Sequence, residues 1–314
     1  SVYPVSAVVT SPDKCVGRGN KVQAPHLKVA AQALGVPVYQ YNKVSKEGLE
    51  DIAALSPDIV VTAAFGQILS ESFLAIPKYG VLNVHASLLP KYRGASPIQQ
   101  AIIDGEENTG VTIMRTVKAV DAGDMLLQGS VTIGKKETTG ELFDRLAILG
   151  GELIVKAIEL MESGKAVFTP QNHEEATHCR MISKADGKID FTKSAKELDC
   201  FVRGMTPWPS AYTYLDGKLL KVFEIEEVED KLALHRMLTE HPRHKALIPN
   251  KYTEGFPWEC GEVVSSDDRY GLIVAVGNCC ELVRLKEIQL EGAKRMSDTA
   301  FLRGREVDIC TKLG

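Results

Sequence analysis

The sequence VLNVHASLLPKYRGASP (Val81–Pro97) begins as a buried strand that carries two polar side chains. Its first five residues alternate in an apolar and β-branched setting, so Asn83 and His85 are expected on one face of the strand. An amide beside an imidazole suits acyl transfer, because the amide can stabilise an oxyanion and the imidazole can move a proton. The alternative is a core histidine hydrogen-bonded by a neighbour, and the strand alone does not exclude it.

The residues after this strand predict a turn and then a helix. Ser87–Pro90 leaves the strand, and Lys91–Arg93 adds charge and an aromatic side chain. Ser96 followed by Pro97 is typical of an N-cap with proline at the first helical position, so a helix is expected to run through Ile102. The stretch is therefore a strand, loop and helix unit.

This unit carries a long, ordered motif, NVHASLLPKYRGASPIQ at Asn83–Gln99, followed by GVTIM at Gly110–Met114. The motif resembles the signature segment of the 10-formyltetrahydrofolate-dependent formyltransferases, and within them the enzymes that formylate methionyl-tRNA. The similarity runs, with gaps, over nearly the whole chain. It implies transfer of a formyl group from 10-formyltetrahydrofolate to the α-amino group of methionine on initiator tRNA, for translation initiation.

The resemblance also assigns roles to individual residues. Asn83 would donate to the oxyanion, His85 would stabilise it and pass a proton, and Asp121 would fix the imidazole tautomer or join the proton relay. Asp121 opens the segment DAGD, and from the residues alone this segment is equally well a plain turn whose Gly123 tolerates unusual dihedral angles. The folate co-substrate is expected to contact the loop residues Ser87, Leu88, Leu89 and Pro90. No metal is required.

Near the start of the chain, the segment SPDKCVGRGNK at Ser11–Lys21 is a basic, glycine-bearing loop. It lacks the third glycine of a dinucleotide fingerprint. The resemblance implies that Arg18 in this loop contacts the acceptor end of the tRNA, and such a residue suits phosphate or base-edge contact. The alternative is an exposed loop without a partner.

Composition and charge are those of an ordinary globular protein. The chain has 314 residues, 44% hydrophobic and 25% charged, and a net charge of −4. The length suits two domains, and the charge argues against a protein that coats nucleic acid but not against one that grips a single RNA end. No apolar run or signal segment is evident, and the seven cysteines contain no CxxC pair. We therefore expect a cytoplasmic monomer with reduced thiols and no membrane contact.

The first half of the chain alternates strands with helices. This order predicts an α/β fold with a doubly wound, mostly parallel sheet, similar to the Rossmann-like sheet of the formyltransferases. Helices are expected at Ala24–Leu34 and Lys46–Ala54, and a longer one after a capping box of Thr138 and Glu141. Leu142, Leu146, Leu149, Leu153 and Ala157 line one face of this long helix, which should cover the sheet.

We expect three segments: a catalytic domain at 1–166, a linker at 167–186, and a C-terminal tRNA-binding β-barrel at 187–314 that resembles an OB-fold. Relative to the family, the first strand of the catalytic domain is missing, and 228–258 is an insertion. His173, His178 and Cys179 in the linker match no closed zinc pattern, so a plain linker is favoured over a metal site.

The sequence leaves two rival functions open. The first is a formyltransferase that acts on a small amine, or a formyltetrahydrofolate hydrolase, since both can use the same Asn, His and Asp set. The second is a non-catalytic RNA-binding protein on the same scaffold. The loop around Arg18 and the downstream barrel favour tRNA over a small amine, and the retained Asn83, His85 and Asp121 argue against loss of catalysis.

Overall fold

The computed structural model describes residues 3–16, 21–229, 258–277 and 281–314. Arg18 and most of the expected insertion at 228–258 lie outside these ranges. The chain divides into two compact units, which are described separately. The first unit comprises Ser1–Ala95, Gly110–Ser130 and Leu146–His178, and the second comprises Ser96–Thr109, Val131–Arg145 and Cys179–Gly314.

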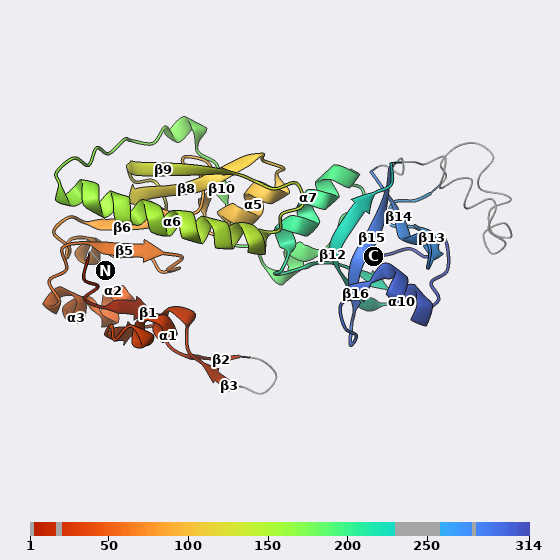
Figure 1. The fold of residues 1–314 in the computed structure, drawn as a ribbon, viewed down its shortest axis with the longest axis horizontal. Helices are drawn as coiled ribbons and strands as arrows, with labels where there is room; N and C mark the ends of the chain where they lie inside the picture. Colours follow the sequence, from red (N-terminus) through yellow and green to blue (C-terminus); the bar gives the residue numbers. More distant parts are fainter. Residues whose placement is uncertain (1–2, 17–20, 230–257, 278–280) are drawn as a thin grey trace. The chain divides into compact units, whose positions relative to one another are not determined.

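Figure 1 shows the elements of the chain from its start to the long helix α6. They are β1 (Val8–Thr10), β2 (Lys14–Val16), β3 (Lys21–Gln23), α1 (His26–Ala33), β4 (Val38–Gln40), α2 (Val44–Glu47), α3 (Leu49–Ala54), β5 (Val60–Ala63), α4 (Glu71–Leu74), β6 (Val81–His85), β7 (Arg93–Gly94), α5 (Pro97–Ile103), β8 (Asn108–Arg115), β9 (Met125–Thr132) and α6 (Thr139–Glu162).

The later elements belong mainly to the second unit. They are two short 3₁₀ helices (His173–Glu175 and Lys184–Gly187), β10 (His178–Cys179), α7 (Ala195–Met205), β11 (Ala211–Leu215), β12 (Lys218–Glu227), β13 (Val263–Asp267), β14 (Gly271–Val276), β15 (Glu281–Leu290), β16 (Met296–Ser297) and α10 (Asp298–Gly304).

The central sheet is mixed, with strand order β5-β6-β8-β9. β5 and β6 are parallel, with Thr62 opposite Asn83. β6 and β8 are antiparallel, with His85 opposite Thr112. β1 and β4 form a separate parallel pair. The expected parallel pairing is therefore present, but the sheet is not mostly parallel, because the chain returns from β6 to β8 in the opposite direction.

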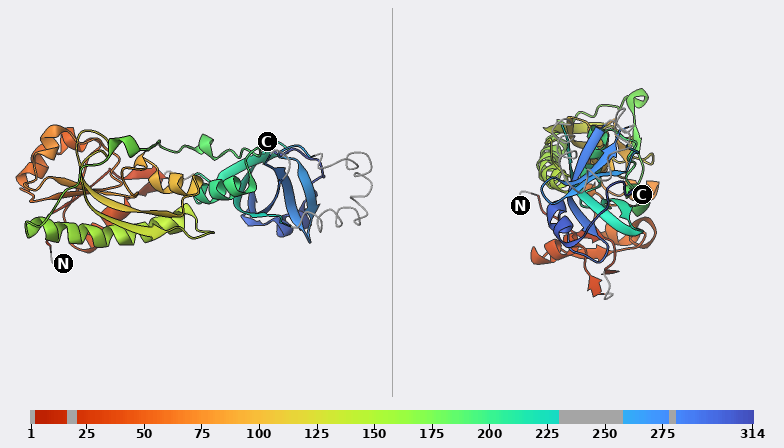
Figure 2. Two further views of the ribbon diagram at one scale, coloured as in Figure 1. Left: turned by 90° about the horizontal axis from the view of Figure 1, so that it is seen from above. Right: turned by 90° about the vertical axis from the view of Figure 1, so that its right-hand side faces the viewer.

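Helix α6 covers one face of the central sheet, as the apolar face of its sequence predicts (Figures 1 and 2). The contact is close, because a Cβ added at Gly150 would lie 2.8 Å from a methyl group of Val84. The capping box is confirmed: the Thr138 amide donates to Glu141 Oε2 at 2.9 Å, and the Glu141 amide donates to Thr138 Oγ1 at 3.5 Å.

Two local expectations were wrong. The helix expected at Lys46–Ala54 is two helices, α2 and α3, that meet at Gly48. A Cβ at Gly48 would lie 2.5 Å from the ring of Tyr41, so the ring occupies the space that a side chain there would need. The expected loop at Ser11–Lys21 contains β2, which pairs with β3 so that Lys14 lies opposite Gln23.

The N-cap expected at Ser96 is also different in detail. Helix α5 begins at Pro97 as predicted, but the Ser96 side chain makes no capping hydrogen bond. Its Oγ instead accepts from the main-chain amide of Ile182 at 3.2 Å. The Ser96 hydroxyl therefore ties the start of α5 to the main chain at Ile182 instead of capping the helix.

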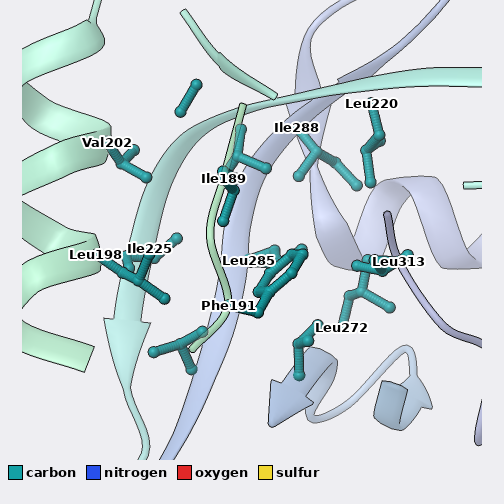
Figure 3. Packing of buried hydrophobic residues seen from close by; sticks show 14 of the residues in the cluster. Ile189, Phe191, Leu198, Val202, Leu220, Ile225, Leu272, Leu285, Ile288 and Leu313 are labelled. Carbon is teal, nitrogen blue, oxygen red and sulfur yellow. The ribbon is translucent and has the colours of Figure 1, made fainter. Parts of the chain in front are cut away.

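The second unit contains an antiparallel sheet of strand order β11-β12-β15-β14-β13, with β16 added beside β15. Figure 3 shows part of the apolar core of this unit, where Leu198 of α7 lies beside Ile225 of β12, and Phe191 lies beside Leu285 of β15. No helix in the described ranges is long and apolar enough to cross a membrane.

Candidate active site

Strand β6 ends with the two polar side chains that the sequence singled out. Asn83 and His85 are two residues apart on a strand, so their side chains share a face of the sheet. His85 is buried, with 5% of its surface exposed, and Asn83 is half-buried. The strand is bounded on both sides by β5 and β8, which fixes its position.

The amide of Asn83 is oriented by the neighbouring strand. Thr62 on β5 lies opposite Asn83, and its hydroxyl donates to Asn83 Oδ1 at 2.9 Å. Because the oxygen of the amide is used in this bond, Nδ2 of Asn83 is the end that points away from Thr62. Asn83 is thus held as a hydrogen-bond donor, the role that stabilisation of an oxyanion requires.

The imidazole of His85 lies between a main-chain carbonyl and a carboxylate. Its Nε2 lies 2.9 Å from the oxygen of Tyr92. A carbonyl oxygen can only accept, so Nε2 carries the hydrogen in the neutral ring. Nδ1, which faces Oδ2 of Asp121 at 3.7 Å, is then the nitrogen that gains or loses a proton.

Asp121 is brought to His85 by the turn between β8 and β9. Its φ is +48°, in the left-handed region that aspartate tolerates better than most residues. The same Oδ2 that faces His85 accepts from the main-chain amide of Gly94 at 2.8 Å. The structure therefore brings Asn83, His85 and Asp121 together, from β6 and from a turn that follows the next strand of the sheet.

The loop Ser87–Pro90 is fixed by polar side chains from β8 and β9. Thr112 accepts from the Leu89 amide at 3.1 Å and donates to the Ser87 carbonyl at 2.7 Å. Gln128 donates to the Leu89 carbonyl at 2.8 Å. The Ser87 hydroxyl donates to the carbonyl of Lys91 at 2.7 Å, which closes the turn. The main chain of this loop is therefore held in place by hydrogen bonds just after the carboxyl end of β6.

Two further residues of this region were missed by the sequence interpretation. Arg93 and Gln171 are both 5% exposed and hydrogen-bonded to each other, with Arg93 Nη2 and Nε at 2.6 and 3.0 Å from Gln171 Oε1. Gln171 lies in the segment expected to be a plain linker. The only sequence signal was its polarity, which a buried and an exposed glutamine share.

His173, considered above for a metal site, lies instead against Arg93, whose Nη2 donates to His173 Nδ1 at 3.1 Å. In the part of the chain that the structure describes, no three His, Cys, Asp or Glu residues are grouped so that they could hold a metal ion. Arg18 lies outside the described residues, in the connection between β2 and β3.

Comparison with known proteins gives the same family for both parts of the chain. The family model described as formyl transferase matches residues 3–158. The model of the formyl transferase C-terminal domain matches residues 181–306.

Solved structures with a similar fold are distant in sequence. HypX from Aquifex aeolicus in complex with tetrahydrofolic acid has a TM-score of 0.61 at 15% identity, and the match covers 96% of this chain and 50% of HypX. The N-formyltransferase from Helicobacter canadensis, in complex with folinic acid and dTDP-3-aminofucose, has a TM-score of 0.59 at 17% identity, over 88% of this chain and 87% of that protein. These matches show a shared fold.

Curated relatives are much more similar. The methionyl-tRNA formyltransferase of Agathobacter rectalis is 43% identical over 307 residues, which is 98% of this chain and 90% of that protein. The methionyl-tRNA formyltransferase of a Bacillus cereus strain is 43% identical over 313 residues, which is 99% of this chain and 91% of that protein. At this identity over nearly the full length, the chain belongs to the methionyl-tRNA formyltransferase family.

Proposed function

We propose that this protein transfers the formyl group from N10 of 10-formyltetrahydrofolate to the α-amino group of methionine esterified to initiator tRNA. The observation that carries the proposal is the position of His85 between the Tyr92 carbonyl and the Asp121 carboxylate, on the strand that also carries Asn83. The curated relatives at 43% identity supply the substrate. An unperturbed α-amino group titrates at about pH 8, so part of it is neutral and nucleophilic near neutral pH.

Asn83 acts on the formyl oxygen in this mechanism. As the amine adds to the formyl carbon, negative charge develops on that oxygen, and Nδ2 of Asn83 donates a hydrogen bond to it. Thr62 keeps Oδ1 of the same amide occupied, so the donor end does not need to rotate into place. A donor that is already oriented stabilises the transition state without a reorganisation cost at the moment of reaction.

His85 and Asp121 handle the proton that the amine loses. Nδ1 of His85 accepts this proton, because Nε2 already carries the hydrogen that it donates to Tyr92. The ring then becomes a cation whose Nδ1–H faces the carboxylate of Asp121. The 3.7 Å separation shortens to a hydrogen bond when Nδ1 is protonated, and the ring returns the proton to the leaving nitrogen of the folate.

The loop of Ser87, Leu88, Leu89 and Pro90 forms one wall of the folate site in this proposal. Its main chain is already held by Thr112 and Gln128, so folate binding does not have to order it. The step uses only side chains of this chain and its two substrates.

The domain assignment belongs to the same proposal. Residues 1–166 form the catalytic domain, 167–186 connect it to the rest, and 187–314 form a small tRNA-binding domain that resembles an OB-fold. The antiparallel sheet of the second unit and the match of the C-terminal family model support this assignment. Arg18, between β2 and β3, provides a contact to the acceptor end of the tRNA.

The experiment is a transfer assay with three acceptors. The protein is incubated with 10-formyltetrahydrofolate and methionyl initiator tRNA, free methionine or a small amino sugar, and each product is measured. Formylation of the charged tRNA far above both small amines is expected. Preferential formylation of a small amine, or release of formate regardless of acceptor, would contradict the proposal and favour a small-amine transferase or a hydrolase.

A further inference from the structure

Gln171 is an unusual residue for the segment in which it lies. Residues 159–180 fall between the two family-model matches at 3–158 and 181–306. The four residues that follow Gln171 are all exposed, whereas Gln171 itself is 5% exposed. Burying a polar amide costs free energy unless its donors and acceptor are hydrogen-bonded, so the partners of this side chain show what holds it there.

Every polar atom of the Gln171 side chain is used. Nε2 donates to the main-chain oxygens of Asp121 at 2.9 Å and Gly123 at 2.7 Å. Oε1 accepts from the guanidinium of Arg93 at 2.6 and 3.0 Å. One amide thus ties the turn that carries Asp121 to the side chain of Arg93, on the strand β7 that follows Tyr92.

Gln171 joins the turn that carries Asp121 to the side chain of Arg93, the residue after Tyr92, and both Asp121 and Tyr92 contact the ring of His85. Tyr92 accepts from Nε2 of His85, and Asp121 faces Nδ1. Thr177, six residues after Gln171, adds to the same arrangement: its Oγ1 accepts from the Tyr92 amide at 2.8 Å, and its carbonyl accepts from the Arg93 amide at 2.9 Å. Contacts therefore run from His85 through Tyr92 and Arg93 to Gln171, and from Gln171 through Asp121 back to His85.

We infer that Gln171 is a positioning residue for formyl transfer, acting through Asp121. By holding the Asp121 turn at a fixed separation from β7, it sets the distance between the Asp121 carboxylate and Nδ1 of His85. This inference rests on the proposed function. Gln171 touches neither substrate in this account, so its removal should slow the chemical step and leave substrate binding intact.

Two substitutions separate the donor half of the amide from its acceptor half. Gln171→Met keeps the length of the side chain and removes all its hydrogen bonds. Gln171→Glu keeps an acceptor for Arg93 but can no longer donate to the Asp121 and Gly123 carbonyls. We expect both to lower kcat about 10- to 100-fold, the scale of a misplaced catalytic group, with the KM values for folate and tRNA changed by no more than about twofold.

The control is Asn172→Ala, in the same segment. Asn172 caps the short 3₁₀ helix at His173–Glu175 and makes none of the contacts to the Asp121 turn. Its kcat should stay unchanged. A similar loss in Asn172→Ala, an unchanged kcat in Gln171→Glu, or a loss of kcat accompanied by large rises in both KM values would each overturn the inference.

A double-mutant cycle tests whether Gln171 acts through Asp121. Gln171→Met is introduced into Asp121→Asn, and single-turnover rates are measured with enzyme in excess. No further loss in the double variant is expected, because the charge that Gln171 positions is already gone. Losses that multiply would overturn the inference. The unchanged protein is assayed alongside: if it fails to formylate methionyl-tRNA, the proposed function is contradicted, whereas full activity in Gln171→Met contradicts only the role of Gln171.

Discussion

Nε2 of His85 lies 2.9 Å from the main-chain oxygen of Tyr92, which fixes the hydrogen of the neutral ring on that nitrogen. The sequence left open whether Asp121 locks the tautomer or takes part in the proton relay. Since Tyr92 already sets the tautomer, the carboxylate of Asp121 faces a nitrogen without a hydrogen, at 3.7 Å. This geometry favours Asp121 as the partner of the protonated ring.

The role of Asp121 is tested by Asp121→Asn. An asparagine can still accept from the Gly94 amide, so the turn should keep its shape, but it no longer attracts a protonated imidazole. We expect kcat to fall about 100-fold, within the range for loss of an acid–base partner. Asp124→Asn, an exposed carboxylate in the same turn, is the control and should keep normal turnover. Equal rates for both variants would remove Asp121 from the mechanism.

The orientation of Asn83 is tested by Thr62→Val, which removes the hydroxyl that bonds to Asn83 Oδ1. The amide is then free to rotate its donor away, and we expect kcat to fall about fivefold to tenfold, equivalent to roughly one hydrogen bond. The matched control is Thr116→Val: the Thr116 hydroxyl is buried and has no hydrogen-bond partner, so its loss should not reduce kcat or stability. The same kcat in both valine variants would argue against this role of Thr62.

In the second unit, stability should depend on the pair Arg284 and Asp298. Asp298 is 0% exposed, and Arg284 donates to its two oxygens at 2.7 and 2.9 Å. This hydrogen bonding raises the pKa of Arg284 above its ordinary value. Gly271 beside the pair has a φ of +89°, and a Cβ there would lie 2.0 Å from Asp298 Oδ2, so the carboxylate packs against a position that only glycine can occupy.

We expect Asp298→Asn to lower the free energy of unfolding by about 2 to 3 kcal/mol, because a partly buried guanidinium loses its counter-charge. Asp268→Asn is the control: Asp268 forms an exposed pair with Arg303 at 3.9 Å, and its loss should cost less than about 1 kcal/mol. Urea unfolding followed by tryptophan fluorescence is suitable, since the chain has two tryptophans, Trp208 and Trp258, and both lie in the second unit. Equal costs would show that the Arg284 pair is not important.

The tRNA contact is tested at Arg18. If this residue grips the acceptor end, Arg18→Ala should lower kcat/KM for methionyl-tRNA about 5- to 150-fold, the range of one bidentate base contact. Folate binding should not change. Arg18→Lys keeps the positive charge but lacks the planar guanidinium, so its kcat/KM for methionyl-tRNA should lie between those of Arg18→Ala and of the protein with Arg18. Rates are compared at two salt concentrations, because phosphate contacts weaken as salt rises. Unchanged tRNA kinetics at both salts would mean that Arg18 makes no such contact.

The sequence predicted best those elements whose signal lies within a few residues. The alternation of Val81–His85 gives β6, and the spacing of Leu142, Leu146 and Leu153 gives the buried face of α6. The strand pattern placed Asn83 and His85 on one face, whereas Asp121, which the structure brings to them, was predicted only from the family resemblance.

What the sequence could not predict depends on partners far along the chain. Gln171 is 48 to 78 residues from the groups that it bonds, and no local pattern distinguishes it from its exposed neighbours. The break between α2 and α3 falls at Gly48, where the ring of Tyr41 occupies the space of a side chain, a packing contact that the periodicity of the segment does not reveal. The antiparallel pairing of β8 with β6 likewise joins residues that are far apart in the chain, such as His85 and Thr112.

The most direct test of the catalytic account is the single-turnover rate of formyl transfer to methionyl-tRNA by His85→Ala and by Asn83→Ala. We predict that each rate falls about 100-fold or more, the scale for losing one acid–base or oxyanion group, while the melting temperature and folate binding stay close to those of the unchanged protein. Transfer at nearly the unchanged rate in both variants would contradict the assignment of Asn83 and His85 to catalysis.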